Sequence, residues 1–359
     1  MPTVVFYALT FVVALAVLII VHEFGHFLVA KWLGVRVVRF SVGIGPIVFS
    51  RTIGETEYAV SAVPIGGYVK MVGEEEGEVL DPADADRAFF ARPLSHRALI
   101  VAAGPTFNFV FAVIVYIVLH LFYGMPLPSD LPRAAAVTPG MPAAAAGLGA
   151  GDLITALDGE PVATWDELSD RIRSSGGRTV KVTFMQGDEE KVVAITPERR
   201  QTKDLFGEVT GEIYLIGLVR DTELRQVPWP SAIVLGFERT GTLTLLVCEG
   251  LYRVVTGRIS ARELGGPIAI ARTAGEQAEQ GIGPFLNALG FLSVNLAVLN
   301  FLPIPVLDGG HLFFFLLELV SRRPLRPRHR EFAQQVGLLI LVSLMLFVFY
   351  NDIQRLLEG

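Results

Sequence analysis

Long apolar stretches dominate the pattern of this chain, and four of them approach the length of a membrane-spanning helix. These stretches cover residues 4–21, 99–123, 285–301 and 337–350. Because a helix needs about 20 apolar residues to cross a bilayer, we expect a polytopic α-helical membrane protein with four transmembrane helices. Together with their flanking turns, the four helices are placed at 1–30, 98–123, 284–320 and 332–350.

A different pattern, in which apolar and polar residues alternate, fills much of the connection between the first two spans. Residues 35–51 read VRVVRFSVGIGPIVFSR, and residues 56–71 read TEYAVSAVPIGGYVKM. The β-branched residues and the glycines between the runs predict a sheet of β-hairpins within 31–97.

Turn residues mark a small domain at 133–197, outside the predicted spans. Turn signals stand at Gly151 and at Asp158-Gly159, and two alternating runs close the segment. Between them we predict a helix starting near Thr164, which has Glu167 at the spacing of a capping box. This α+β arrangement resembles a bacterial PDZ domain, which indicates a fold but identifies no ligand.

The following segment, 198–283, is predicted to be a linker that carries an amphipathic helix at the membrane surface. Its apolar part, 230–256, is interrupted by Glu238, Arg239, Glu249 and Arg253, which favours a helix lying on the outer leaflet over a fifth span. A fifth span would also reverse the direction of all later helices.

Composition supports a lipid environment, because 52% of the residues are hydrophobic and the mean hydropathy is +0.50. The net charge of −6 and the lone Cys248 add little. We therefore expect the lipid bilayer as a partner and no nucleic acid.

Basic residues near the span ends predict the orientation. They gather in the first and third connections, at Lys31, Arg36, Arg39, Arg92 and Arg97, and at Arg322, Arg323, Arg326, Arg328 and Arg330. By the positive-inside rule both connections are cytoplasmic and the segment 124–283 is outside. The first and third spans then run in the same direction, so their C-terminal ends lie at similar depth near the cytoplasmic face.

The first span carries a chemical motif, His22-Glu23-Phe24-Gly25-His26, inside its apolar run. Histidines four residues apart project from one face of a helix and can hold one metal ion, for which Zn²⁺ is the natural choice. Ionisable groups within a membrane are costly and are usually functional. We therefore interpret His22 and His26 as zinc ligands and Glu23 as the general base. The alternative is a polar pair packed between helices.

A catalytic zinc needs a third protein ligand, and the sequence NFLPIPVLDGGH at 300–311 offers one. Asp308 follows Pro303 and Pro305, which are predicted to break the helix of the third span at the depth already assigned to the histidines. An aspartate before two glycines is also a common turn or helix cap, so that alternative stays open. His311 is a weaker candidate ligand.

HEFGH in a first span, combined with an NxxPxPxLDGG stretch in a later one, resembles the site-2 protease family of intramembrane zinc metalloproteases. The regulator-of-sigma-E proteases of bacteria are the most similar group within it. The stretches FSVGIGP at 40–46, PIGGYVKMVGE at 64–74, AAGPTFNF at 102–109 and ELGGPIAIA at 263–271 resemble that group in the same order. Many members carry two tandem PDZ domains, whereas this chain has room for one.

The resemblance implies roles for further residues. The hairpin sheet would dip into the membrane and receive an unwound substrate along a strand edge, although a hairpin that only packs is the alternative. Asn295, Asn300, Pro303 and Pro305 would position the substrate, while the two asparagines could instead form hydrogen bonds between helices. The PDZ domain would regulate access, as a peptide receptor or as a size filter.

We therefore expect an intramembrane zinc endopeptidase of the bacterial inner membrane, with its active site near the cytoplasmic face. Its substrates would be single-span membrane proteins, such as a trimmed anti-sigma factor or remnant signal peptides. Two other classes are considered: a membrane-anchored PDZ scaffold with a vestigial metal site, and a metal transporter.

Overall fold

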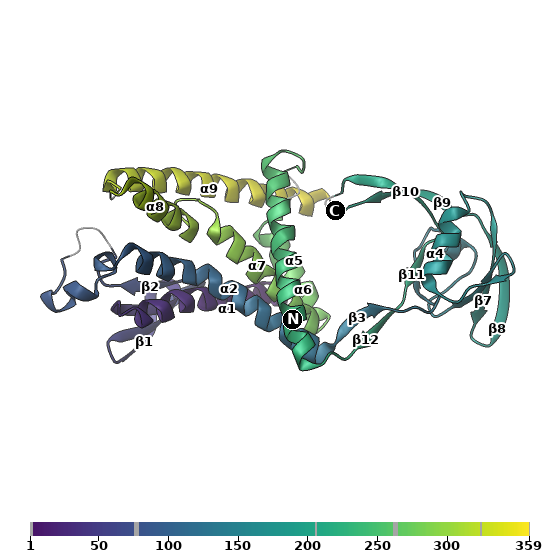
Figure 1. The fold of residues 1–359 in the computed structure, drawn as a ribbon, viewed down its shortest axis with the longest axis horizontal. Helices are drawn as coiled ribbons and strands as arrows, with labels where there is room; N and C mark the ends of the chain where they lie inside the picture. The colour runs from purple at the N-terminus through teal and green to yellow at the C-terminus, as the bar shows by residue number, and fades with distance from the viewer. Residues whose placement is uncertain (1–2, 75–78, 205–206, 261–264, 324, 359) are drawn as a thin grey trace. The chain divides into compact units, whose positions relative to one another are not determined.

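The computed structural model describes residues 3–74, 79–204, 207–260, 265–323 and 325–358. The chain divides into two compact units, one formed by Met1–Leu121 with Pro228–Gly359 and the other by Phe122–Val227. Figure 1 shows the first unit as a group of helices with a small sheet, and the second as a mainly β structure.

Long helices build the first unit. They are α1 (Thr3–Trp32), α2 (Leu94–Tyr123), α5 (Trp229–Val255), α6 (Pro267–Glu279), α7 (Ile282–Phe301), α8 (Asp308–Ser321) and α9 (Pro327–Glu358). Buried apolar residues, among them Ala30, Ile100 and Phe315, join α1, α2, α8 and the sheet into one core. A second cluster packs Ala14 and Leu18 of α1 against Leu289 of α7.

Five of these helices, α1, α2, α5, α7 and α9, are long and apolar enough to cross a membrane. The extra one is α5, which covers the stretch that we expected to be too polar for a span. In Figure 1 α5 runs across the direction of α1, α2 and α9. The count of four spans remains a prediction.

The predicted third transmembrane segment at 284–320 consists of two helices, because α7 ends at Phe301 and α8 begins at Asp308. Pro303 and Pro305 lie in the break. Leu302 is extended, with φ −65° and ψ 143°, which is the conformation that a following proline imposes. The fourth helix is longer than the predicted 332–350, since α9 covers Pro327–Glu358.

The hairpin sheet between α1 and α2 is present, formed by β1 (Val37–Ile53) and β2 (Thr56–Met71). Each strand bends back, so residues 39–42 pair both with 57–60 and with 67–70. Gly43 has φ +88° at the bend of β1, a conformation that favours glycine. The segment 67–71 is hydrogen-bonded to β1 on one side only, and it forms an edge of the sheet.

The described residues of the second unit form ten strands and two helices. They are β3 (Met125–Pro128), β4 (Ala134–Val137), α3 (Pro142–Ala145), β5 (Leu153–Leu157), β6 (Glu160–Pro161), α4 (Trp165–Ser174), β7 (Val180–Gln186), β8 (Glu189–Ile195), β9 (Glu198–Lys203), β10 (Val209–Leu215), β11 (Leu218–Arg220) and β12 (Thr222–Arg225). The predicted cap of α4 is present, because Thr164 Oγ1 accepts a hydrogen bond of 3.2 Å from the Glu167 N–H.

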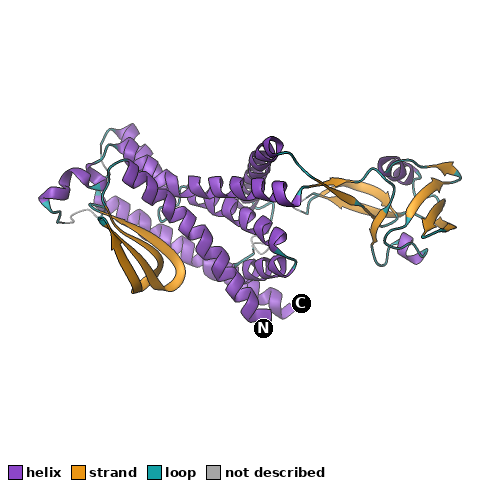
Figure 2. Cartoon of the chain, turned by 90° about the horizontal axis from the view of Figure 1, so that it is seen from below, coloured by secondary structure: helices purple, strands orange, loops and turns teal. Residues whose placement is uncertain are grey.

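This second unit is larger than the predicted domain at 133–197, and the expected linker from 198 onward begins with strands. β11 pairs with β4, β12 pairs with β3, and Ile216 lies in the buried core. The C-terminal strands of the unit therefore pair with its N-terminal ones. Figure 2 shows in orange the strands that make up most of this unit.

Candidate metal centre

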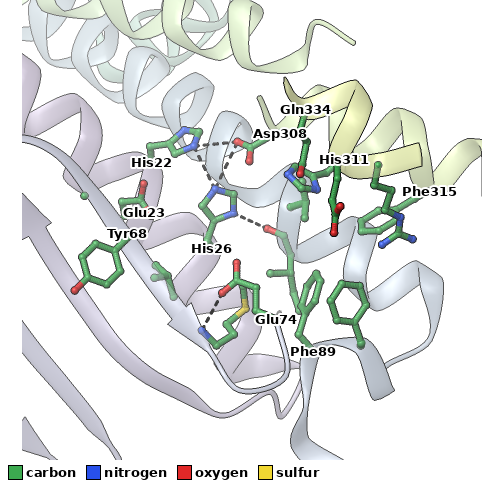
Figure 3. Close-up of a pocket in the computed structure, with 18 residues that line it drawn as sticks. His22, Glu23, His26, Tyr68, Glu74, Phe89, Asp308, His311, Phe315 and Gln334 are labelled. Carbon is green, nitrogen blue, oxygen red and sulfur yellow. Dashed lines mark hydrogen bonds and ion pairs between the residues drawn. The ribbon is translucent and has the colours of Figure 1, made fainter. Parts of the chain in front are cut away.

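Three side chains converge between α1 and α8. His22 Nε2 lies 3.0 Å from Asp308 Oδ2, and His26 Nε2 lies 3.5 Å from the same oxygen. The two imidazole Nε2 atoms are 3.2 Å apart. Figure 3 shows the three polar atoms facing one point. The residues that the sequence predicted as ligands are thus brought together, although they are far apart in the chain.

The geometry fits a zinc ion. Bonds of about 2.0–2.1 Å in a tetrahedron place neighbouring ligand atoms about 3.3–3.4 Å apart, close to the separations observed among these three atoms. Asp308 Oδ2 is buried and faces the Nε2 atoms of both histidines. Two imidazole nitrogens and one carboxylate oxygen form the kind of donor set that leaves a fourth position open for a catalytic zinc.

Local sequence explains how Asp308 reaches the histidines. The break after α7 makes Asp308 the first residue of α8, where the helix dipole favours a carboxylate. The two glycines that follow allow the chain to turn tightly here. A Cβ at Gly309 would lie 2.2 Å from the Leu302 carbonyl oxygen, and one at Gly310 would lie 2.2 Å from that of Ile304.

Helix α2 approaches the same centre closely. A Cβ on Gly104 would lie only 2.3 Å from His26 Nε2, so glycine is required there. Pro105 cannot donate a helical hydrogen bond, which loosens this turn of α2. The carbonyl of Ile100 accepts a hydrogen bond of 2.8 Å from His26 Nδ1, which leaves Nε2 of that ring available to a metal.

The other histidine also has a partner on α2. Asn108 Nδ2 lies 3.1 Å from His22 Nδ1, and the Asn108 side chain is fully buried. No role was predicted for Gly104 or Asn108 from the sequence. They were mentioned only as part of the stretch AAGPTFNF at 102–109, for its resemblance to the family. The available signal was an asparagine inside an apolar span, four residues after a glycine and therefore on the same face of the helix.

Glu23 lies outside the group of three ligand atoms but lines the same cavity of about 490 Å³. Its Cγ would be 3.0 Å from a Cβ on Gly67, so the Glu23 side chain lies against the edge segment of β2. Gly67, Tyr68 and Val69 of that segment line the cavity too. A carboxylate and a strand edge thus border one space beside the metal ligands.

His311 lines this cavity from α8, one turn after Asp308. Among the described residues it is not part of the group whose ligand atoms converge. The structure therefore favours Asp308 over His311 as third ligand.

The two asparagines predicted to position a substrate do not line the cavity. Asn295 Nδ2 donates a hydrogen bond of 2.9 Å to the Phe291 carbonyl one turn earlier in α7. Asn300 is half-buried near the end of α7. Their role in substrate binding remains a prediction, as does that of Pro303 and Pro305 beyond the break that they occupy.

Three side chains that could hold a metal ion, among apolar helices and with a carboxylate beside them, are the arrangement expected of a membrane metalloprotease. Residues 10–344 match the profile of peptidase family M50, so the chain belongs to this family, the site-2 proteases. It is accordingly a metalloprotease of the membrane.

Relatives of similar length carry names that describe proteases. A protein of Agrobacterium fabrum, whose name provisionally describes it as a zinc metalloprotease, is 36% identical over 98% of this chain and 96% of its own length. The regulator of sigma E protease of Haemophilus influenzae is 30% identical over 97% and 98%, respectively. The zinc metalloprotease RasP of Geobacillus kaustophilus is 30% identical over 97% of each chain.

A solved structure is similar to part of the chain. The PDZ domain of an SdrC-like protein from Listeria monocytogenes is 30% identical, with a TM-score of 0.21 over 27% of this chain and 93% of that domain.

Proposed function

We propose that this chain is a zinc endopeptidase that cuts single-span membrane proteins within or beside their spans. The observation that carries the proposal is the group formed by His22, His26 and Asp308, with Glu23 and a strand edge bordering the same cavity. A bound zinc ion would act as a Lewis acid toward water and the scissile carbonyl. His22, His26 and Asp308 would hold it.

Glu23 supplies the proton transfers in this proposal. Its carboxylate takes a proton from the attacking water and later delivers it to the leaving nitrogen of the peptide bond. The position of Glu23 supports this role, because the side chain is not needed as a ligand and contacts Gly67 of the strand edge. A substrate strand lying along that edge would pass close to the carboxylate.

The edge segment of β2 explains how a transmembrane substrate could be held. A helix in lipid satisfies all its own backbone hydrogen bonds, so a peptide bond becomes accessible only where the helix unwinds. Residues 67–71 have one hydrogen-bonded side and could accept the unwound segment as an added strand. Ile44, Ile47, Val48 and Phe49 are exposed on the same sheet, which supports its contact with lipid.

The second unit is proposed to control access from outside the membrane. It has a groove of about 290 Å³ between α4 and the segment 214–218, lined by Trp165, Leu168 and Ile216 among others. A groove between a strand and a helix is the place where PDZ domains receive peptides. The substrates proposed are a trimmed anti-sigma factor or remnant signal peptides, in the inner membrane of a bacterium.

The proposal is tested with the full chain purified in detergent and a single-span substrate labelled at both ends. Mass spectrometry should locate the cut within or next to the hydrophobic segment. Removal of metal by a chelator should stop cleavage, and added Zn²⁺ should restore it. Cleavage that is insensitive to the chelator, or that falls only in a soluble domain of the substrate, would contradict the proposal.

Asp308→Ala provides a second test of the metal centre. The two histidines remain, but a three-ligand site becomes a two-ligand site, so both zinc content and turnover should fall. His311→Ala is the matched comparison from the same helix, and it should keep zinc. Full zinc content in Asp308→Ala would show that the third ligand is another residue.

A further inference from the structure

Asn108 is a polar side chain in the middle of an apolar helix, and it touches a metal ligand. Its exposed fraction is 0%, and its Nδ2 lies 3.1 Å from His22 Nδ1. The other end of the amide, Oδ1, is buried without a hydrogen-bond partner among the described residues. A buried amide left half-satisfied is costly, so its presence at this position requires an explanation.

Metal binding by His22 provides an explanation for the buried amide of Asn108. An imidazole that binds through Nε2 carries its proton on Nδ1, and that N–H needs an acceptor. The oxygen and nitrogen of a side-chain amide occupy nearly equivalent positions, so a half-turn of the Asn108 amide places Oδ1 against His22 Nδ1. In that orientation Oδ1 accepts a hydrogen bond from the Nδ1–H of His22, and Nδ2 takes the place that Oδ1 leaves. The ring of His22 is then fixed in the tautomer that binds metal.

The two histidines are then oriented by different kinds of partner on α2. His26 Nδ1 pairs with a main-chain carbonyl, that of Ile100, which no substitution removes. His22 depends on a side chain. Asn108 stands four residues after Gly104, so the same face of α2 provides both the space for His26 and the acceptor for His22.

We propose that Asn108 is a positioning residue of the zinc centre, which accepts the His22 Nδ1 proton and holds the ring for coordination through Nε2. This inference rests on the zinc site of the proposed function. It does not depend on which substrate is cut.

Three full-length variants separate hydrogen bonding from packing. Asn108→Leu keeps the side-chain size and removes the acceptor. Asn108→Asp keeps an acceptor oxygen at the same place. Ser293→Ala is the matched control, because Ser293 Oγ donates a hydrogen bond of 2.8 Å to the Asn108 main-chain oxygen and does not contact the metal ligands.

Zinc affinity is measured by competition with a chelating dye, and Co²⁺ absorption in the visible range reports the ligand geometry. Asn108→Leu should weaken zinc binding by about 10–100-fold, the usual effect of losing an outer partner of a ligand, and should change the Co²⁺ spectrum. Asn108→Asp and Ser293→Ala should keep affinity and spectrum close to those of the parent chain.

Other outcomes overturn the proposal. Parent affinity and spectrum in Asn108→Leu would show that no acceptor is needed. Equal losses in the Leu and Asp variants, or a loss in Ser293→Ala as large as that in Asn108→Leu, would show that Asn108 acts by packing. Because these readouts involve no substrate, tight zinc binding without any cleavage would count against the protease proposal and leave this inference standing.

Discussion

At the scale of single residues, two glycines allow helix backbones to come close enough to form the metal centre. A Cβ on Gly25 of α1 would lie 2.5 Å from the Ala103 carbonyl oxygen, and one on Gly104 of α2 would lie 2.3 Å from His26 Nε2. Both distances are far inside the 3.5–4.0 Å at which non-bonded atoms attract. The contact between α1 and α2 therefore depends on residues without side chains.

Gly104→Ala should remove zinc while leaving the protein folded. The added methyl group would occupy the space of the metal-binding nitrogen of His26, so we expect zinc affinity to fall by about 100-fold or more. Gly241→Ala is the control, because a Cβ at this position of α5 meets open space. Zinc content after dialysis against a weak chelator gives the readout. Parent zinc content in Gly104→Ala would contradict the geometry of α2 at the centre.

At the scale of elements, the interruption between α7 and α8 and the anchoring of the sheet position the catalytic parts. Glu55 lies in the turn between β1 and β2 and accepts hydrogen bonds from Arg87 (2.8 Å) and Lys31 (3.3 Å). The hydrogen bond from Arg87, followed by that from Lys31, lowers the pKa of Glu55 to about 2. Since Lys31 is in the last turn of α1, this ion pair links the sheet to the helix that carries His22 and His26.

Glu55→Gln should reduce stability in a pH-dependent way. A carboxyl with a lowered pKa stabilises the folded state above its ordinary value of 4.5, and that contribution is lost as the pH falls toward 2. The three side chains are each about a third exposed, so the loss of Tm at pH 7 should be only about 1–3 °C. Thermal unfolding of parent and variant in detergent should give Tm values that approach each other as the pH falls from 5 toward 2. A difference that does not change with pH would exclude this ion pair as its cause.

Sequence reasoning located the helical spans, the hairpin sheet and three residues whose ligand atoms converge, because each leaves a local signature. Apolar length predicts α1 and α2, alternation predicts β1 and β2, and the spacing of His22 and His26 predicts one face of a helix. The break between α7 and α8 was predicted from Pro303 and Pro305, although apolar residues continue through it.

Other features have no local signature. The strands β11 and β12 are three and four residues long, and their partners β4 and β3 precede them by about 80 to 100 residues. Short strands paired over such distances cannot be recognised from alternation alone. Asn108 likewise becomes significant only when folding brings it to His22.

At the scale of the whole molecule, the two units are expected to have different roles. The catalytic candidates His22, Glu23, His26 and Asp308 all lie in the first unit, and the second unit inserts between α2 and α5. The second unit carries none of these residues. We therefore expect it to select substrates and not to take part in hydrolysis.

Replacing residues 124–227 with a flexible linker should broaden substrate choice without stopping hydrolysis. These limits follow the observed unit, because replacing only 133–197 would remove β4 to β8 and leave β11 without its partner β4. Cleavage of an intact and an externally trimmed substrate is compared in both enzymes. The parent should prefer the trimmed substrate, and the variant should cut both. Unchanged discrimination would contradict a role in access, and an inactive variant with zinc bound would assign the unit to catalysis.

The central claim is that zinc is held by His22, His26 and Asp308 while Glu23 moves the proton, and Glu23→Gln tests it most directly. Zinc content and turnover of a single-span substrate are measured on the same purified samples of parent and variant. We predict unchanged zinc content and a turnover lowered by about 10²–10⁴-fold, the usual contribution of a general base. A zinc-loaded Glu23→Gln enzyme that cuts the substrate at the parent rate would contradict the account.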